Sequence, residues 1–171
     1  YRWKYPAYFA LGSNQLDIRL GLLNTIVLIG SSLTMVLAVR AAQLGRAKEI
    51  AGWIAATMTL GTAFLVVKGF EYHHKWVHHL IPGAGFHIEG TTDPAAQTFF
   101  VLYFCMTGLH ALHMIVGLGL LAFLVPKALR GEFSAENHNW VEGVGLYWHF
   151  VDIIWIFLFP LLYLLGRHHS F

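Results

Sequence analysis

The chain has 171 residues, of which 57% are hydrophobic and 12% are charged, and its formal net charge is +2. A chain this apolar carries more hydrophobic side chains than a water-soluble core of its size can bury, which predicts that much of it lies in a membrane. The small net charge provides no basic surface of the kind that nucleic-acid binding requires. The single cysteine, Cys105, excludes a disulfide within the chain and a cysteine-based metal site.

Long runs with few or no charges predict four membrane-spanning helices. Roughly 20 apolar residues, at about 1.5 Å per residue, cross the ~30 Å hydrocarbon core of a bilayer. The second run reaches Lys68, whose long stem can snorkel to the interface, and the fourth contains Asp152 as its only charge. We therefore expect an all-α, polytopic transmembrane helix bundle, a single membrane domain over residues 1–171 with spans near 20–42, 50–72, 95–126 and 141–166.

The start of the chain and its loops indicate how it lies in the membrane. Residues 1–19 begin with an aromatic, basic stretch, which is typical of an interfacial segment, and because the first residue is Tyr1 rather than methionine we expect missing upstream sequence. The connections 40–49 and 127–142 lie on one side of the membrane and have the higher density of basic residues. The positive-inside rule therefore predicts that the loop 127–142 faces the cytoplasm.

Small residues recur at every fourth position in the first two spans. Such ladders allow helix backbones to approach closely in lipid, so we expect both to mark helix–helix contacts. The ladders consist of Gly30, Thr34, Ala38 and Ala42 in the first span, and of Ala51, Ala55, Thr59 and Ala63 in the second.

Polar side chains near the middle of the last two spans are costly in lipid unless they have partners. His110 and His113 are three residues apart on one helix, and His149 and Asp152 have the same spacing on the next. Because these helices are antiparallel neighbours, we expect the four groups to lie at comparable depth and to be able to form one hydrogen-bonded cluster with a paired or protonated carboxylate. Their first role is packing, and Glu71 either lies at the interface or caps a buried polar contact.

Two arrangements of histidines could bind a metal ion. Histidines on facing helices can ligate haem iron, as in membrane b-type cytochromes, which would make the chain an electron-transfer subunit. Against this, the first two spans have no interior histidine, and Asp152 lies one turn from His149. The run from His73 to His79 could gather imidazoles around copper or zinc, but no cysteine or carboxylate completes an obvious ligand set. We therefore expect a solvated loop at residues 73–79, and no metal or haem bound by this chain.

Five short sequence motifs occur along the predicted spans, and together they are highly specific. They are Leu22-Leu-Asn-Thr25, Glu71-Tyr72, Phe99-Phe100, Thr107-Gly-Leu-His-Ala-Leu-His113 and Tyr147-Trp-His-Phe-Val-Asp-Ile-Ile-Trp155. The histidine string of the third span and the aromatic string that begins the fourth are the most specific, and they stand at the right distance from each other. Over about residues 20–166, the combination resembles subunit III of the haem-copper respiratory oxidases, the cytochrome c oxidase subunit 3 family.

This resemblance implies a fold and a role. The family's usual seven helices divide into a pair and a group of five, and this chain matches the last four. The helix before Leu22, which carries a membrane-embedded glutamate in the family, is therefore expected to be truncated or lost. The family's subunit III has no catalytic centre of its own. It packs on subunit I, which holds the haems and copper beside the oxygen-reduction site, binds phospholipid, supports proton uptake and protects the complex during turnover.

The resemblance also implies particular residues and partners. Lys127 and Arg130 match positions where the family has basic residues at lipid headgroups, and His138 follows them in the loop. Cations at the interface can pair with lipid phosphates, although positive-inside topology explains them nearly as well. The implied partners are subunit I, other oxidase subunits, phospholipid and a respiratory supercomplex, in a bacterial plasma or mitochondrial inner membrane. The residues do not choose between cytochrome c and quinol as electron donor.

Overall fold

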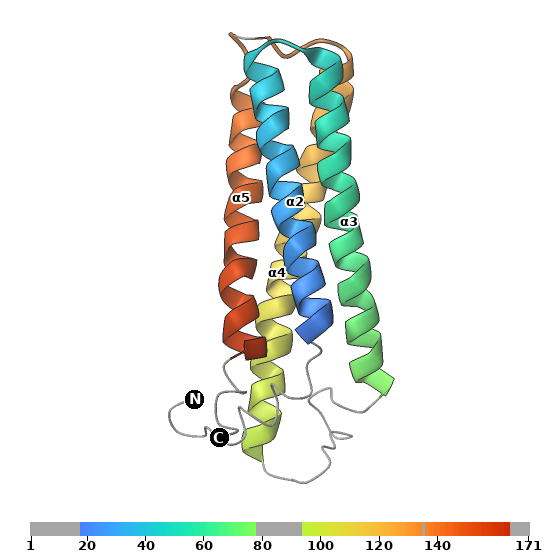
Figure 1. Ribbon diagram of the computed structural model, residues 1–171, viewed down its shortest axis with the longest axis vertical. Helices are drawn as coiled ribbons and strands as arrows, with labels where there is room; N and C mark the ends of the chain where they lie inside the picture. Colours follow the sequence, from blue (N-terminus) through green and yellow to red (C-terminus); the bar gives the residue numbers. More distant parts are fainter. Residues whose placement is uncertain (1–17, 78–93, 135, 165–171) are drawn as a thin grey trace.

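Four long helices form an elongated bundle in which each helix runs antiparallel to the next one in the chain (Figure 1). The structure, a computed structural model, describes residues 18–77, 94–134 and 136–164. Its elements are α2 (Ile18–Gln43), α3 (Ala47–Val77), α4 (Pro94–Leu129), α5 (Asn139–Phe159) and a π-helical turn, η1 (Pro160–Leu164), that continues α5. The predicted all-α class is confirmed.

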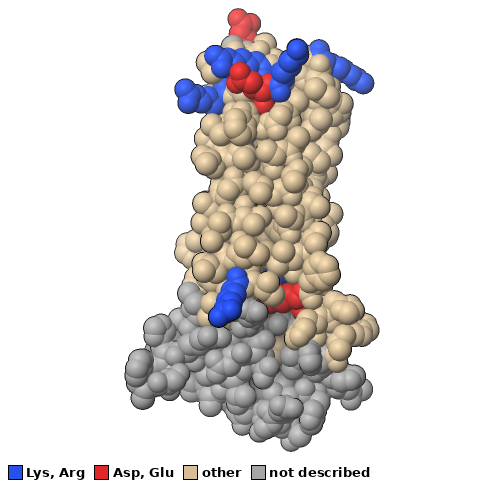
Figure 2. Space-filling model, turned by 45° about the vertical axis from the view of Figure 1, so that its right-hand side comes forward, with Lys and Arg blue, Asp and Glu red and all other residues tan. Residues whose placement is uncertain are grey.

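Each of the four helices is long and apolar enough to cross a membrane. The candidate spanning segments, by length and composition, are Ile18–Gln43, Ala47–His74, Thr98–Leu129 and Asn139–Tyr163. Figure 2 shows an uncharged belt between the two ends of the bundle, with lysine, arginine and acidic side chains gathered at the end that carries the α2–α3 and α4–α5 connections. The predicted four spans are confirmed. The single domain over residues 1–171 and the interfacial role of residues 1–19 stay predictions, because residues 1–17 lie outside the described part.

Two glycines end helices at the charged end of the bundle. Gly45 has a φ of 69° and Gly131 a φ of 72°, a left-handed conformation that favours glycine. At the first turn, Gly45 N–H donates to Ala42 O (2.9 Å) and Arg46 N–H donates to Ala41 O (3.0 Å), and the turn after α4 has the same pair of bonds. This glycine cap satisfies carbonyl groups at the helix end and reverses the chain within a few residues.

Two tryptophans of α5 fix its position against α2. Each helix packs on the next one in the chain, and α5 closes the bundle by packing on α2. Trp148 Nε1 donates to Ser31 Oγ (3.1 Å), and Trp155 Nε1 donates to Thr25 Oγ1 (3.2 Å). Both indoles are fully buried, so their N–H groups need these partners in an interior without water.

Of the two small-residue ladders, the first is at a helix interface and the second is largely not. Ala38 and Ala42 of α2 are fully buried. On α3 only Ala51 is buried, whereas Ala55, Thr59 and Ala63 are exposed, so the expected close contact along this ladder is wrong. The reason is that larger side chains give α3 a different buried stripe, which consists of Ile50, Ile54, Thr57, Gly61, Phe64, Lys68 and Glu71.

Candidate functional site

A buried ion pair lies near the end of α3 that is remote from the charged turns. Lys68 Nζ is 2.9 Å from Glu71 Oε2, and the two residues are only 5% and 4% exposed. The hydroxyls of Tyr103 and Tyr163 donate to Glu71 Oε1 at 2.9 and 2.7 Å. Lys68 Nζ lies 4.7 Å from the centre of the Trp155 ring, within cation–π range. Opposite charges in contact and several hydrogen bonds are what a buried pair needs to persist in a membrane interior.

The structure corrects the predicted position of Lys68. This residue was expected to snorkel to the interface, but its ammonium group is buried in the bundle. The sequence allows Glu71 either an interfacial or a buried position, and the structure shows the buried one, in the pair with Lys68. The spacing contained a signal: Lys68 and Glu71 are three residues apart and continue the buried stripe of α3 at helical periodicity. Tyr163 could not be predicted, because the π-helical turn places it in the cluster.

His110 and His113 point in different directions from α4. His110 is 3% exposed and packs on Phe64 and Trp155, with ring centres 5.5 and 5.2 Å away, and neither of its ring nitrogens has a hydrogen-bond partner among the described residues. His113 is partly exposed, and its Nδ1 bonds its own helix at Leu109 O (2.8 Å). The expected hydrogen-bonded cluster of four is therefore wrong, because His110 and Asp152 make no hydrogen bond within the described part of the chain.

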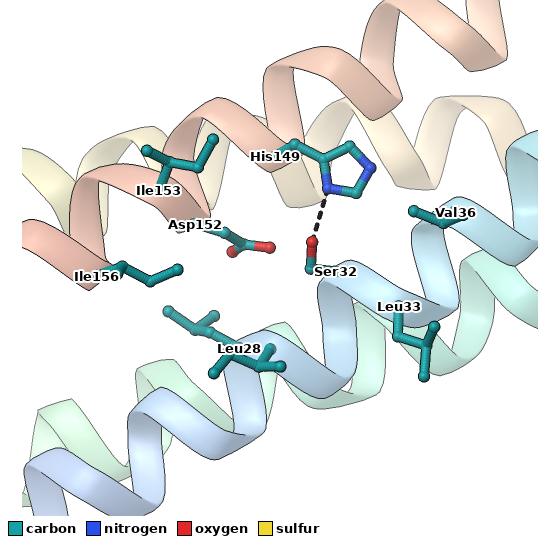
Figure 3. Close-up of a pocket in the computed structure, with 9 residues that line it drawn as sticks. Leu28, Ser32, Leu33, Val36, His149, Asp152, Ile153 and Ile156 are labelled. Carbon is teal, nitrogen blue, oxygen red and sulfur yellow. Dashed lines mark hydrogen bonds between the residues drawn. The ribbon is translucent and has the colours of Figure 1, made fainter.

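His149 and Asp152 line a groove between α2 and α5 (Figure 3). The groove has a volume of about 430 Å³ and is otherwise almost entirely apolar, with Leu28 and Ile156 among its walls. His149 Nδ1 and Ser32 Oγ are 2.7 Å apart and link the two helices. Asp152 is 3% exposed, and both of its carboxylate oxygens lack a partner among the described residues. Ser32 was not predicted, since a serine in an apolar run gives no indication of which helix it faces.

The residues predicted to bind lipid lie at the charged end but already have acidic neighbours. Lys127 Nζ and an Arg130 guanidinium nitrogen are 3.9 and 3.8 Å from the Glu132 carboxylate. His138 Nε2 is 3.2 Å from Glu142 Oε1. These contacts place Lys127 and Arg130 close together around one carboxylate, while His138 belongs to a separate pair. A lipid role for the three residues stays a prediction.

Another groove runs between α3 and α4 and reaches the charged end of the bundle. Its volume is about 900 Å³, and its walls include the exposed ladder residues Ala55, Thr59 and Ala63 of α3. On α4 its last lining residue is Pro126, the direct neighbour of Lys127. The Lys127 ammonium group also lies 4.6 Å from the centre of the Phe123 ring. An apolar groove therefore ends beside a cation.

The histidine loop is only partly described. Residues 73–77 belong to α3, so the expected loop is wrong over this part; His73 and His74 are exposed on the helix, and His78 and His79 lie outside the described residues. Within residues 18–77, 94–134 and 136–164, no group of three or more histidine, cysteine, aspartate or glutamate side chains could hold a metal ion. The expectation that this chain binds no metal or haem stays a prediction.

Fold and polar groups together define a class: a polytopic α-helical membrane protein with a buried ion pair, a buried carboxyl that has no hydrogen-bond partner among the described residues, and apolar grooves. Comparison with known proteins gives the family. The family model of cytochrome c oxidase subunit III matches residues 8–167. The chain belongs to this family, and the predicted resemblance is confirmed.

Three relatives illustrate the match. The chain is 35% identical to cytochrome c oxidase subunit 3 of Synechocystis, over 96% of this chain and 65% of the relative. It is 33% identical to the probable cytochrome c oxidase subunit 3 of Mycobacterium leprae (88% and 69%) and 30% identical to the cytochrome bo(3) ubiquinol oxidase subunit 3 of Pseudomonas aeruginosa (91% and 68%). The chain thus spans about two thirds of the length of these curated relatives.

Proposed function

We propose that this chain is subunit III of a haem-copper terminal oxidase, a non-catalytic subunit of the enzyme that reduces oxygen in aerobic respiration and couples this to proton pumping. The observation that carries the proposal is the family match over residues 8–167. Relatives that are named as subunits of cytochrome c and ubiquinol oxidases support it, and they leave the electron donor open. In this proposal the haems and copper lie in partner subunits, and the bundle packs on subunit I in an energy-transducing membrane, with the loop 127–142 on the cytoplasmic side.

The test is co-purification from the native membrane. An affinity tag on this chain should recover, in mild detergent, a complex that contains haem and consumes oxygen. In a strain that lacks the chain, the remaining oxidase should still turn over but lose activity faster during sustained turnover, because the proposed role is to support proton uptake and protect the complex. Recovery of the chain without haem proteins, or an unchanged active lifetime in the deletion strain, would contradict the proposal.

The alternative, a b-type haem-binding electron-transfer subunit, has no specific observation in its favour. The His110 ring packs against the rings of Phe64 and Trp155, which also contact each other, and His149 Nδ1 is hydrogen-bonded to Ser32 Oγ. A visible spectrum of the isolated chain separates the two functions, because only a bound haem gives a Soret band. Such a band would favour the alternative.

We also propose that the chain holds a phospholipid in the groove between α3 and α4. The groove is largely apolar, with the hydroxyls of Thr59 and Thr62 bonded to their own helix. It ends at Pro126, and Lys127 and Arg130 follow at headgroup height. Glu132 is shared by the two cations, so this corner has one positive charge more than it has negative charge. That excess suits a lipid phosphate, while His138, which is paired with Glu142, contributes more weakly.

Charge-neutral substitutions test the lipid site. The double variant Lys127→Gln/Arg130→Gln should reduce the phospholipid retained by the purified complex and shorten its active lifetime. Arg46→Gln is the matched control, since Arg46 is an exposed cation at the same end of the bundle and is likewise paired with an acidic residue, Glu49. Equal lipid retention and lifetime in wild type and double variant would show that the two cations serve membrane topology alone.

A further inference from the structure

Two tyrosines share one carboxylate oxygen in the buried ion pair of Lys68 and Glu71. The hydroxyls of Tyr103 and Tyr163 both donate to Glu71 Oε1, at 2.9 and 2.7 Å. Lys68 Nζ donates to the same two hydroxyl oxygens, at 3.3 and 2.7 Å, and to Glu71 Oε2 at 2.9 Å. All four residues are at most 5% exposed. Each phenol therefore has a charged base that can accept its proton and a cation beside its oxygen.

The chain departs from regular helical geometry to complete this cluster. Tyr163 lies in η1, the π-helical turn that follows α5 at Pro160. Such turns are rare and occur frequently at functional sites, and ionisable residues within a membrane span are costly and usually functional. A packing contact between helices requires neither a π-helical turn nor a buried charge. Both features favour a chemical role for the cluster.

Aromatic rings that can be oxidised surround the ammonium group of Lys68. Its Nζ lies 4.7 Å from the centre of the Trp155 ring. The ring centres of Tyr103 and Tyr163 are each 5.3 Å from the same atom. Because all three rings contact one ammonium group, an electron can tunnel between them. A phenol loses its proton when it loses an electron, and the carboxylate of Glu71 is in place to accept that proton.

We propose that Tyr103 and Tyr163 form a redox-active pair, which gives one electron to a high-potential one-electron oxidant and the phenolic proton to Glu71. The phenol O–H bond breaks, the electron reduces the oxidant by one equivalent, and the proton forms an O–H bond with Glu71 Oε1. The products are a neutral phenoxyl radical and a carboxylic acid that are hydrogen-bonded to each other. The return of one electron reverses these changes. Oxygen reduction generates oxidants of this class, and only this source of the oxidant rests on the proposed function.

A photosensitiser on Cys105 tests the proposal in the purified full chain. Cys105 is the single cysteine, is exposed, and lies two residues from Tyr103 on α4. A ruthenium polypyridyl maleimide is attached to its thiol, excited by a laser flash and converted to Ru(III) by an added electron acceptor. We expect Ru(III) to be reduced again while a phenoxyl absorption band rises. The reaction should be slower in D2O than in H2O, because the proton moves with the electron.

The result in the unaltered chain decides the proposal without any variant. No phenoxyl signal, an indole radical alone, or equal rates in D2O and H2O would overturn it. The measurement needs neither haem nor oxygen. Its failure is therefore distinguishable from failure of the proposed function, which is tested by co-purification of haem.

Variants of the cluster then identify the groups that carry the reaction. Tyr103→Phe/Tyr163→Phe removes both phenols, and Lys68→Met/Glu71→Gln keeps the phenols but removes their base. Each double variant should slow the recovery of the sensitiser at least about ten-fold, the factor expected for the loss of a hydrogen bond to a charged group. An unchanged rate in either double variant would refute the proposal.

Tyr72→Phe is the matched control. The Tyr72 ring is 6.2 Å from the Tyr103 ring, but its hydroxyl is hydrogen-bonded to the Thr107 hydroxyl, which is neutral and does not take up a proton. The rate in this variant should equal that of the unaltered chain. A loss as large as in the double variants would show that oxidation does not depend on the carboxylate of Glu71, and would overturn the assignment to Tyr103 and Tyr163.

Discussion

Two glycines that contact Trp148 offer the sharpest test of the packing. A Cβ on Gly61 of α3 would lie 2.7 Å from Trp148 Cη2 and 2.9 Å from Cζ2, and a Cβ on Gly117 of α4 would lie 2.9 Å from Cε3 and 3.0 Å from Cζ3. The two contacts are on different edges of the same six-membered ring. The indole cannot easily move away, because it is fully buried and its Nε1 is bonded to Ser31 Oγ.

We therefore expect Gly61→Ala and Gly117→Ala to destabilise the bundle. Overpacking of a filled core costs about 1–3 kcal/mol, and the gain in helix propensity from glycine to alanine offsets up to ~1 kcal/mol of this. With the full offset the net loss is about 0–2 kcal/mol for each variant, so the ranking against the controls is the decisive measurement. The controls are Gly119→Ala and Gly52→Ala, where a Cβ would meet no atom within 4 Å, so the propensity gain is unopposed.

Unfolding of the purified chain in mixed detergent micelles, followed by tryptophan fluorescence, measures these differences. The ranking should be Gly119→Ala and Gly52→Ala at or above wild type, and Gly61→Ala and Gly117→Ala below it. The double variant Gly61→Ala/Trp148→Phe should recover part of the loss, because the smaller ring vacates the atoms that clash. If Gly61→Ala and Gly117→Ala were as stable as the controls, the packing of Trp148 between α3 and α4 would be incorrect.

Three further predictions concern the polar groups. Lys68→Met should destabilise the bundle by about 3–5 kcal/mol, because it leaves Glu71 buried without its counter-charge. The double variant Lys68→Met/Glu71→Gln should recover much of this loss. If the single and the double variant were equally stable, the ion pair would be contradicted. His149→Leu and Ser32→Ala should each cost about 0.6–2 kcal/mol, through the same lost interhelical bond, and should leave the haem spectrum of the oxidase unchanged. A cysteine at Ser134, in a Cys105→Ser background, should react with an impermeant thiol reagent only from the cytoplasmic side, and labelling from the opposite side would reverse the topology.

The depth of a side chain in the membrane could be predicted from the sequence better than the side of the helix on which it lies. The four spans follow from the length of charge-free runs, because lipid thickness fixes how many apolar residues a crossing needs. The direction of a side chain around a helix is harder to predict, because the lipid-facing surface is as apolar as the core. Leu33, Phe70 and Phe157 are exposed in the bundle, although in a soluble protein such residues would mark its interior. The ladder of α3 was misassigned for this reason.

Pairs of polar residues were predictable only where they share one helix. Lys68 and Glu71 are three residues apart, so their contact follows from helical geometry. The tyrosines that complete the cluster come from α4 and from η1, and the register of one helix against another depends on how bulky side chains such as Trp148 and Trp155 fit. The expected cluster assumed that four residues lie at similar depth and also face one another, namely His110, His113, His149 and Asp152. Their depth follows from the sequence, but the rotation of each helix about its own axis does not.

The α3–α4 side and the α2–α5 side of the bundle differ in how their buried polar groups are partnered. On the α3–α4 side, the buried charge of Lys68 is matched by Glu71 and two tyrosines, and the outer surface is an apolar groove that ends at Lys127. A phospholipid fits such a surface, because its acyl chains fill the apolar groove and its phosphate pairs with the cation. On the α2–α5 side, both carboxylate oxygens of Asp152 lack a hydrogen-bond partner within the described part of the chain. If the lipid proposal holds, photo-crosslinking from a probe at Val66, which lines the α3–α4 groove, should yield mainly lipid adducts.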